Sequence, residues 1–210
     1  LVHRLDRETS GLLLIAKNLK YTKIFGKLFR LQKIKKIYLA LCEGKPKLKE
    51  SYVDLAIKDK DMNSSVQTKT YYKVISYNNK TSLIQFEPKT GKKHQLRIVA
   101  KNLGCPIVGD NKYNLNQSNK HENLKLNAHK LEFDIENVVF NYKSKLPKDF
   151  TDYVKNKQIS YFWYYYLRFL KLFKNISENS LSKFSSVILI SNSCNDVFLK
   201  FLRPHASMNL

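Results

Sequence analysis

One short segment near the start of the chain places a single carboxylate between two guanidinium groups. The segment 3–11 reads H-R-L-D-R-E-T-S-G, with Asp6 between Arg4 and Arg7. Arginine forks match a carboxylate and favour its ionised form, and an ionised, oriented aspartate can serve as a nucleophile. A single carboxylate between cations is not the carboxylate pair of a glycosidase. A polar turn that leads into a strand is the alternative interpretation.

A second segment gathers positive charge at the expected start of a helix. The stretch T-G-K-K-H-Q-L-R begins at Thr90, which is predicted to cap a helix that contains Arg97. Cations at this end oppose the helix dipole, and helix N-termini bind phosphate well, so the pattern favours an anion there. Arg97, one turn further on, is expected to reach toward a carboxylate. The glycine spacing is not that of a P-loop. The side chains expected to face phosphate are Lys92, Lys93 and His94.

Isolated aromatic and histidine side chains have mainly structural interpretations. Tyr38 stands alone on the less apolar face of a predicted strand, where a tyrosine usually packs. His129 is expected to be a hydrogen-bonded structural histidine. The spacing of His3, His94 and His129 is not that of metal ligands, so no metal is predicted.

Strands and short helices must position these segments. Apolar runs and alternating patterns predict strands over residues 12–16, 36–42, 52–57, 69–77, 81–87 and 130–140. A tight turn is expected at Asn78 and Asn79, between two of these strands. The predicted helices follow Asn18, Thr90 and Pro147, and the second ends at Gly104. Hairpins with interspersed helices predict an α+β fold, a mainly antiparallel mixed sheet with flanking helices.

The composition changes near residue 157. All six glycines lie before this point, whereas residues 157–210 contain no glycine and 11 of the aromatic residues. We therefore expect a boundary near residue 157, with one domain over residues 1–156 and an aromatic-rich tail of uncertain fold over residues 157–210; the family resemblance described below implies that residues 1–156 are a catalytic domain.

The net charge narrows the class of partner. Lys+Arg 38 against Asp+Glu 17 gives +21, which favours a polyanion, either nucleic acid or an anionic membrane surface. The longest strongly apolar stretch, 161–167, is far shorter than the ~20 residues that span a bilayer. The cysteines lie far apart, which excludes a zinc framework and fits a reducing compartment. They are Cys42, Cys105 and Cys194.

Five segments in order resemble the RluA/RluC/RluD family of pseudouridine synthases. H-R-L-D-R-E-T-S-G-L-L-L-I-A-K looks like the family's catalytic-aspartate motif, and K-I-Y-L-A-L is similar to the segment that carries its active-site tyrosine. T-G-K-K-H-Q-L-R followed by L-G-C-P-I-V-G-D-N-K-Y resembles a third motif region. N-A-H-K-L-E-F and L-P-K-D-F complete the order. The resemblance covers residues 1 to about 155 and is most like the RluC-type enzymes of large-subunit ribosomal RNA.

The resemblance implies an isomerase that converts specific uridines of 23S ribosomal RNA to pseudouridine without a cofactor. It implies that Asp6 attacks the uridine, that Tyr38 stacks on the flipped base and abstracts a proton, and that Arg97 pairs with Asp6. Arg4 would fill the gap left by the flipped nucleotide. The expected RNA-contacting residues are Arg4, Arg7, Lys92, Lys93 and His94.

The resemblance also implies a cytoplasmic, monomeric protein of ribosome biogenesis without stable membrane association. The family's catalytic domain normally begins before H-R-L-D, so we expect a domain incomplete at its N-terminus. The alternatives are an inactive gene fragment, at most a basic RNA-binding remnant, and a membrane-surface protein. The tail has three interpretations: aromatic stacking on RNA, contact with a membrane surface, or read-through of non-coding sequence.

Overall fold

The computed structural model describes residues 1–59, 64–115 and 122–159, and the backbone of residues 187–193 and 196–199. The aromatic segment 161–167 and the basic residues that follow it lie outside the described residues. The interpretations of the tail that depend on them therefore stay predictions.

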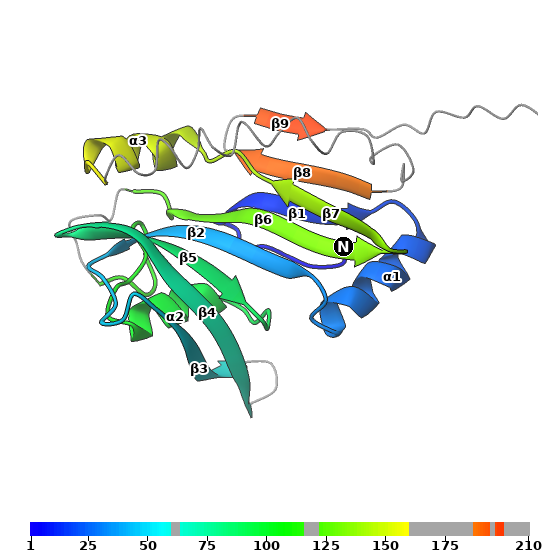
Figure 1. The fold of residues 1–210 in the computed structure, drawn as a ribbon, viewed down its shortest axis with the longest axis horizontal. Helices are drawn as coiled ribbons and strands as arrows, with labels where there is room; N and C mark the ends of the chain where they lie inside the picture. The colour runs from blue at the N-terminus through cyan, green and yellow to red at the C-terminus, as the bar shows by residue number, and fades with distance from the viewer. Residues whose placement is uncertain (60–63, 116–121, 160–186, 194–195, 200–210) are drawn as a thin grey trace, which may run out of the picture.

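A nine-stranded mixed sheet organises the chain (Figure 1). The strand order is β3-β4-β5-β2-β6-β1-β8-β9, with β7 paired to β6, and β1 and β6 form the parallel pair. The remaining pairs are antiparallel, as expected for a chain built from hairpins. The strands are β1 (Ser10–Ala16), β2 (Lys35–Glu43), β3 (Glu50–Asp59), β4 (Ser64–Asn78), β5 (Thr81–Pro88), β6 (Leu126–Ile135), β7 (Val138–Lys143), β8 (Val187–Ser193) and β9 (Asp196–Leu199).

Within the described residues, three helices cover the sheet. Helix α2 (Gln95–Asn102) packs on one face of β2 and β5, and α3 (Lys148–Asn156) packs on the other (Figure 1). Helix α1 (Leu19–Arg30) covers the end formed by β1, β6 and β7. The predicted α+β class, with a mainly antiparallel mixed sheet and flanking helices, is confirmed.

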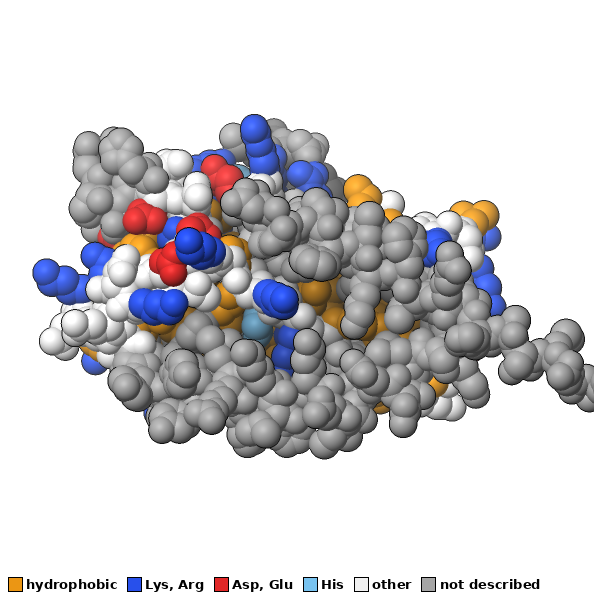
Figure 2. Space-filling model, turned by 90° about the horizontal axis from the view of Figure 1, so that it is seen from above, with side chains coloured by type: hydrophobic (Ala, Val, Ile, Leu, Met, Phe, Trp, Pro, Cys, Tyr) orange, Lys and Arg blue, Asp and Glu red, His pale blue; other side chains and the backbone are white. Residues whose placement is uncertain are grey.

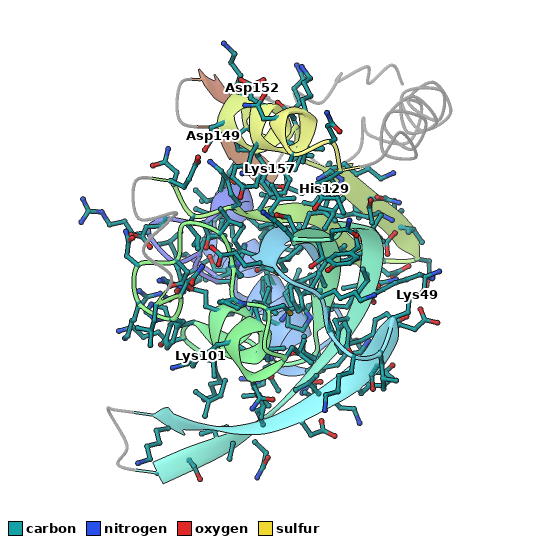
Figure 3. All side chains as sticks on the ribbon, turned by 90° about the vertical axis from the view of Figure 1, so that its left-hand side faces the viewer. Lys49, Lys101, His129, Asp149, Asp152 and Lys157 are labelled. Carbon is teal, nitrogen blue, oxygen red and sulfur yellow. The ribbon has the colours of Figure 1, made fainter. Side chains whose placement is uncertain are left out.

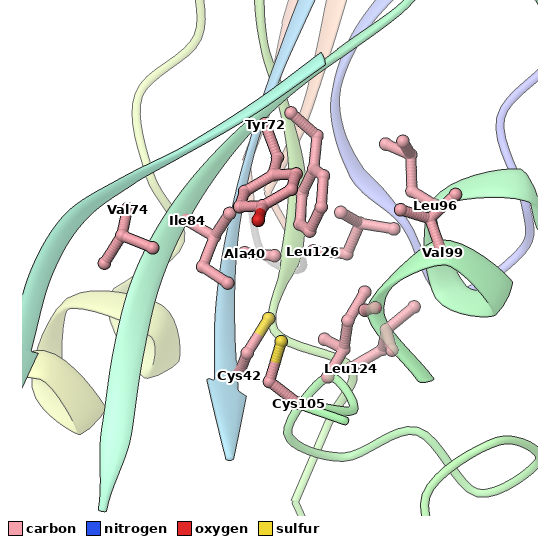
Figure 4. Close-up of a cluster of buried hydrophobic side chains, with 13 residues drawn as sticks. Ala40, Cys42, Tyr72, Val74, Ile84, Leu96, Val99, Cys105, Leu124 and Leu126 are labelled. Carbon is pink, nitrogen blue, oxygen red and sulfur yellow. The ribbon is translucent and has the colours of Figure 1, made fainter. Parts of the chain in front are cut away.

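Strand β2 lies in the middle of the sheet and is buried on both faces. Ala40 and Cys42 belong to the core beneath α2, whereas Leu39 and Leu41 belong to the core beneath α3. Figure 4 shows the first of these cores, where the side chains of Cys42 and Cys105 meet beside Tyr72. This packing holds the strand that carries Tyr38 rigidly between two layers.

Two local predictions are confirmed by hydrogen bonds. Asn18 caps α1, because its side-chain oxygen accepts a hydrogen bond from the backbone N–H of Tyr21 at 3.1 Å. The turn between β4 and β5 falls at Asn79, whose φ is 54°, and the Asn78 side chain accepts from the N–H of Thr81 at 2.9 Å.

Two other local predictions are wrong. Helix α2 begins at Gln95 rather than just after Thr90, and its N-cap, His94, has a left-handed backbone (φ 56°, ψ 18°) without a side-chain cap. Thr90 instead donates its hydroxyl to the Gln95 side chain at 2.9 Å. The predicted strand 130–140 is a hairpin of β6 and β7, because Glu136 and Asn137 both have positive φ and reverse the chain.

The start of β1 crosses β6 at very short distance. Gly11 pairs with Ala128, and its φ of 111° is rarely adopted by residues with a side chain. A Cβ atom at Gly11 would lie 2.3 Å from the backbone oxygen of Ala128. The crossing is held by Asn127, which donates to Ser10 at 2.9 Å and accepts from Ser144 at 2.7 Å.

We expect Gly11→Ala to lower the free energy of unfolding by more than about 2 kcal/mol, since backbone strain and a clash with backbone atoms add. The matched control is Gly26→Ala in α1, where a Cβ meets nothing within 4 Å. That substitution is expected to raise stability by roughly 0.5–1 kcal/mol. Urea denaturation measures both values. Equal effects of the two substitutions would contradict the close crossing.

Candidate active site

A tight turn fixes the position of Asp6 just before β1. The backbone N–H of Thr9 donates to the carbonyl of Asp6 at 2.9 Å, and Thr9 is buried. Upstream, the His3 ring accepts from the N–H of Leu14 at 2.8 Å and stacks on Phe29 at 4.6 Å between centroids. The segment 3–9 therefore folds back along β1, and Asp6 lies just before the point where β1 crosses β6.

Register across the sheet brings Tyr38 toward the same point. Tyr38 pairs with Ala128 of β6, and Ala128 pairs with Gly11 of β1, so one row of the sheet joins the tyrosine to the segment after Asp6. A β-bulge between Ile37 and Tyr38 redirects the strand there.

Burial raises the pKa of the Tyr38 phenol well above its usual value, and the charge of Asp6 raises it further. At neutral pH Tyr38 is therefore protonated, because its phenolate is disfavoured by both effects. A protonated phenol stacks on a base and donates a hydrogen bond, but it abstracts a proton only after losing its own. The predicted role of Tyr38 as proton acceptor thus requires a second group that takes the phenol proton.

His94 is the side chain that the structure places next to Asp6. Its Nε2 lies 3.9 Å from Oδ1 of Asp6, and both side chains are mostly buried, with exposed fractions of 16% and 20%. Burial lowers the pKa of His94, Asp6 opposes this effect, and the charges of Arg97, Lys112 and Lys93 add to it.

The predicted direct pair between Arg97 and Asp6 is wrong. Arg97 donates from Nε and Nη2 to the two carboxylate oxygens of Asp110, at 2.8 and 2.7 Å, and its Nη1 lies 3.5 Å from Glu8. Arg97 pairs with Asp110 rather than with Asp6 because the carboxylate of Asp110 is fully buried and needs a cation beside it. Asp6 instead lies on a partly exposed turn. The Asp6 charge still acts on Arg97 electrostatically.

Asp110 organises the region behind Arg97. Besides the guanidinium, its carboxylate accepts from the backbone N–H groups of Lys112 and Tyr113, each at 2.9 Å. Burial would raise the pKa of Asp110, but the hydrogen bonds from Arg97, Tyr113 and Lys112 lower it overall. The Arg97 guanidinium is only 5% exposed and is held by Asp110, close enough to Asp6 for their charges to interact.

Sequence reasoning missed Asp110, Tyr113 and Glu8. The signal that was available for Asp110 is the run G-D-N-K-Y, in which an aspartate after a glycine commonly accepts from N–H groups two and three residues on. No comparable signal exists for Glu8, since its contact with Arg97 joins segments that are distant in the sequence.

The basic residues predicted to contact RNA lie around this cluster. Arg4, Arg7 and Lys93 are exposed, and none of them forms an ion pair with another described residue. Lys92 is partly buried and donates its N–H to Gln95. Lys36, which was not predicted, donates to the carbonyl of Thr90 at 3.1 Å; burial, followed by the charge of Lys89, lowers its pKa to about 8.

The surface around α3 differs from the surroundings of Asp6 in its charged side chains. Figure 2 shows acidic and basic side chains intermixed there. Lys125 lies 2.9 Å from Asp149, and Lys155 lies 3.9 Å from Asp152. Figure 3 shows both aspartates on or beside α3. Because its cations are paired with carboxylates, this face attracts a polyanion less strongly than the exposed Arg4, Arg7 and Lys93 near Asp6.

Two buried histidines make stability depend on pH. Burial, followed by the charge of Lys36, lowers the pKa of His3 to about 4. Burial, followed by the charges of Lys143 and Lys130, lowers the pKa of His129 to about 4. Both values lie below that of the unfolded chain, about 6.5. The neutral rings therefore favour folding above pH 6.5, and this contribution is lost as the pH falls toward 4.

We expect the free energy of unfolding to fall by on the order of 1–2 kcal/mol per histidine between pH 7 and pH 5. The variant His3→Gln keeps an acceptor for the N–H of Leu14 but does not titrate, so its stability should fall less over this range. Urea denaturation at both pH values measures the difference. An identical decrease in wild type and in His3→Gln would contradict the assignment for His3.

Comparison with solved structures shows which known fold the chain shares. Human RNA pseudouridylate synthase domain containing 4 matches with a TM-score of 0.69 and 25% identity, over 76% of each chain. Human RNA pseudouridylate synthase domain containing 1 shares the fold, with a TM-score of 0.61 and 20% identity over 76% of this chain and 80% of that one. The fold is thus that of pseudouridylate synthase domains.

Sequence relatives identify the family. The family model described as RNA pseudouridylate synthase matches residues 1–102. An uncharacterized RNA pseudouridine synthase of Zymomonas mobilis is 36% identical over 164 residues, which cover 72% of this chain and 75% of that protein. The chain belongs to the RNA pseudouridine synthase family. The expected family is therefore confirmed.

Other relatives are considerably longer than this chain. Ribosomal large subunit pseudouridine synthase C of Rickettsia bellii is 40% identical over 71% of this chain and 54% of that protein. Ribosomal large subunit pseudouridine synthase D of Borreliella burgdorferi is 32% identical over 74% of this chain and 51% of that protein. The match to these two proteins spans about half of their length.

Within the described residues, no helix is both long and apolar enough to cross a membrane.

Proposed function

We propose that this chain isomerises uridine to pseudouridine in large-subunit ribosomal RNA, with Asp6 as the nucleophile. The names of the Rickettsia bellii and Borreliella burgdorferi relatives support the substrate class. The observation that carries the proposal is the meeting of three separate segments at one carboxylate. Asp6 lies 3.9 Å from His94, and its charge acts on both Tyr38 and Arg97.

The chemistry suits a cluster of this kind. In the isomerisation the base leaves the sugar as the glycosidic C–N bond breaks, and the sugar rejoins it through a ring carbon. That carbon loses a proton and the freed ring nitrogen gains one, so the overall reaction needs neither a redox partner nor a cofactor. Asp6 supplies the electron pair that forms a bond to the sugar carbon as the base leaves, and this bond breaks again when the ring carbon of the base attacks the same sugar carbon. The nearby guanidinium of Arg97 stabilises the negative charge that Asp6 carries before and after this step.

The target uridine must leave its stack before the reaction. Unstacking a base costs a few kcal/mol, which contacts between basic side chains and phosphates offset. The exposed cations Arg4, Arg7 and Lys93 are placed to supply such contacts near Asp6. In this scheme Tyr38 lies under the flipped base, and Arg4 occupies the gap that the base leaves.

The finer assignments follow from the same proposal. We infer an RluC-type enzyme of ribosome biogenesis that acts in the cytoplasm as a monomer, without a metal or stable membrane association. Its catalytic domain comprises residues 1–156, and the C-terminal segment of residues 157–210 follows it in the sequence. Backbone pairing of β8 with β1 links part of that segment to the sheet.

A direct assay tests the proposal. The chain is incubated with transcribed large-subunit ribosomal RNA, and pseudouridine is detected by its alkali-stable carbodiimide adduct, which stops reverse transcription. We expect new stops at a small number of uridines. RNA binding without any new stop would favour the alternative, a basic RNA-binding remnant without catalysis.

A further inference from the structure

The segment 105–115 follows α2, and besides holding Arg97 through Asp110 it approaches the site closely through Tyr113. The hydroxyl of Tyr113 lies 3.0 Å from Nδ1 of His94, and the two rings meet edge to face at 5.6 Å between centroids. Tyr113 is itself fixed, because its backbone N–H donates to Asp110 and its ring lies 5.3 Å from Cζ of Arg97.

The other nitrogen of the same ring faces the nucleophile. Nε2 of His94 lies 3.9 Å from Oδ1 of Asp6, and neither side chain is freely solvated. The backbone of His94 has φ 56° and ψ 18°, a conformation that residues with a Cβ rarely adopt and that is often found at functional sites. Tyr113, His94 and Asp6 therefore form one row of polar groups.

We propose that Tyr113 fixes the tautomer of His94, so that His94 holds and orients the Asp6 carboxylate as a positioning residue. The hydroxyl of Tyr113 donates to the unprotonated Nδ1, which leaves the ring proton on Nε2. An ionised carboxylate only accepts hydrogen bonds, so an Nε2–H is the matching donor. The consequence for catalysis rests on the function proposed above, whereas the tautomer does not.

The charges around His94 support a neutral ring. Burial disfavours a second ring proton, as do the charges of Arg97, Lys112 and Lys93, whereas the charge of Asp6 favours one. A neutral histidine has one donor and one acceptor, and Tyr113 and Asp6 face one ring nitrogen each. The distance of 3.9 Å is longer than a hydrogen bond, and we expect it to shorten when RNA closes the site.

Nitrogen-15 NMR of the wild-type chain tests the tautomer directly. Long-range proton–nitrogen correlations at neutral pH should show the proton of His94 on Nε2 and an unprotonated Nδ1. In Tyr113→Phe, the proton should be shared between the two nitrogens. A proton found mainly on Nδ1 in the wild type would overturn the proposal, whatever the activity.

Turnover on ribosomal RNA tests the consequence. Tyr113→Phe is expected to lower kcat about tenfold or more with little change in KM, and His94→Leu at least as much. His94→Gln keeps a donor close to the position of Nε2 and should recover most of the rate lost in His94→Leu. Tyr71→Phe is the matched control, because that partly buried tyrosine also donates its hydroxyl to another side chain, Glu50, at 2.7 Å.

The two proposals fail in different ways. Wild-type turnover in Tyr113→Phe, with the change of tautomer present, would remove His94 from the positioning of Asp6. A wild-type chain that lacks turnover would contradict the proposed function, and the NMR measurement would then decide the tautomer alone. A change in KM only would overturn the positioning role and assign His94 to RNA binding.

Discussion

Replacement of Asp6 by alanine or asparagine is expected to abolish pseudouridine formation, with a loss of more than about a thousandfold in the single-turnover rate. Neither of the two carboxylates described beside Arg97 is placed to replace it, since Glu8 lies 3.5 Å from Arg97 and Asp110 is fully buried against the same guanidinium. Loss of a nucleophile commonly has effects of this size, because its step has no equally fast alternative.

RNA binding should survive these substitutions. Removal of a negative charge from a chain of net charge +21 leaves the attraction to phosphate intact or slightly stronger. Filter binding across a salt series measures this affinity. Asp152→Asn is the matched control, because it removes the same charge from an exposed part of α3 (Figure 3). Turnover of the Asp6 variants within tenfold of the wild type would refute Asp6 as the nucleophile.

The largest effect on stability is expected for Asp110→Ala, which should lower the free energy of unfolding by about 3–5 kcal/mol. The substitution leaves the Arg97 guanidinium, only 5% exposed, without its bidentate partner, and it removes the acceptor of two backbone N–H groups. Removal of one member of a buried ion pair costs more than removal of both, because the remaining charge is still desolvated.

A double-mutant cycle checks this prediction. Arg97→Leu combined with Asp110→Ala should recover part of the stability lost in Asp110→Ala alone, because no unpaired charge remains in the core. Urea denaturation at neutral pH measures the four proteins. A loss below about 1 kcal/mol in Asp110→Ala would show that solvent reaches the guanidinium, in conflict with its burial.

The two predictions concern residues with different roles in the same cluster. Asp6 is proposed to act on the substrate, and its replacement should change the rate without changing the free energy of unfolding. Asp110 touches only protein groups, and its replacement should reduce stability and, through Arg97 and Tyr113, also reduce activity. A loss of activity in Asp110→Ala at a temperature where the chain stays folded would therefore report on positioning.

Local sequence predicted the elements well where short-range physics decides them. The cap at Asn18, the turn at Asn79 and the alternation along β2 depend on neighbouring residues, and all three are confirmed. The prediction for Thr90 is wrong because its hydroxyl bonds to the Gln95 side chain, and a loop takes the place of the first helical turn. The hydrogen bond between Thr90 and Gln95 depends on how the surrounding fold places these two side chains, which the local sequence does not determine.

The sequence by itself determined the family, the fold class, the basic character and the segments that carry Asp6, Tyr38 and Arg97. These properties are encoded in residue types and short spacings. Only the tertiary structure decided which groups touch. Arg97 pairs with Asp110 rather than Asp6, and His94 stands between Asp6 and Tyr113. The physical reason is that a buried charge binds the best-placed partner, and the packing of distant segments determines which partner that is.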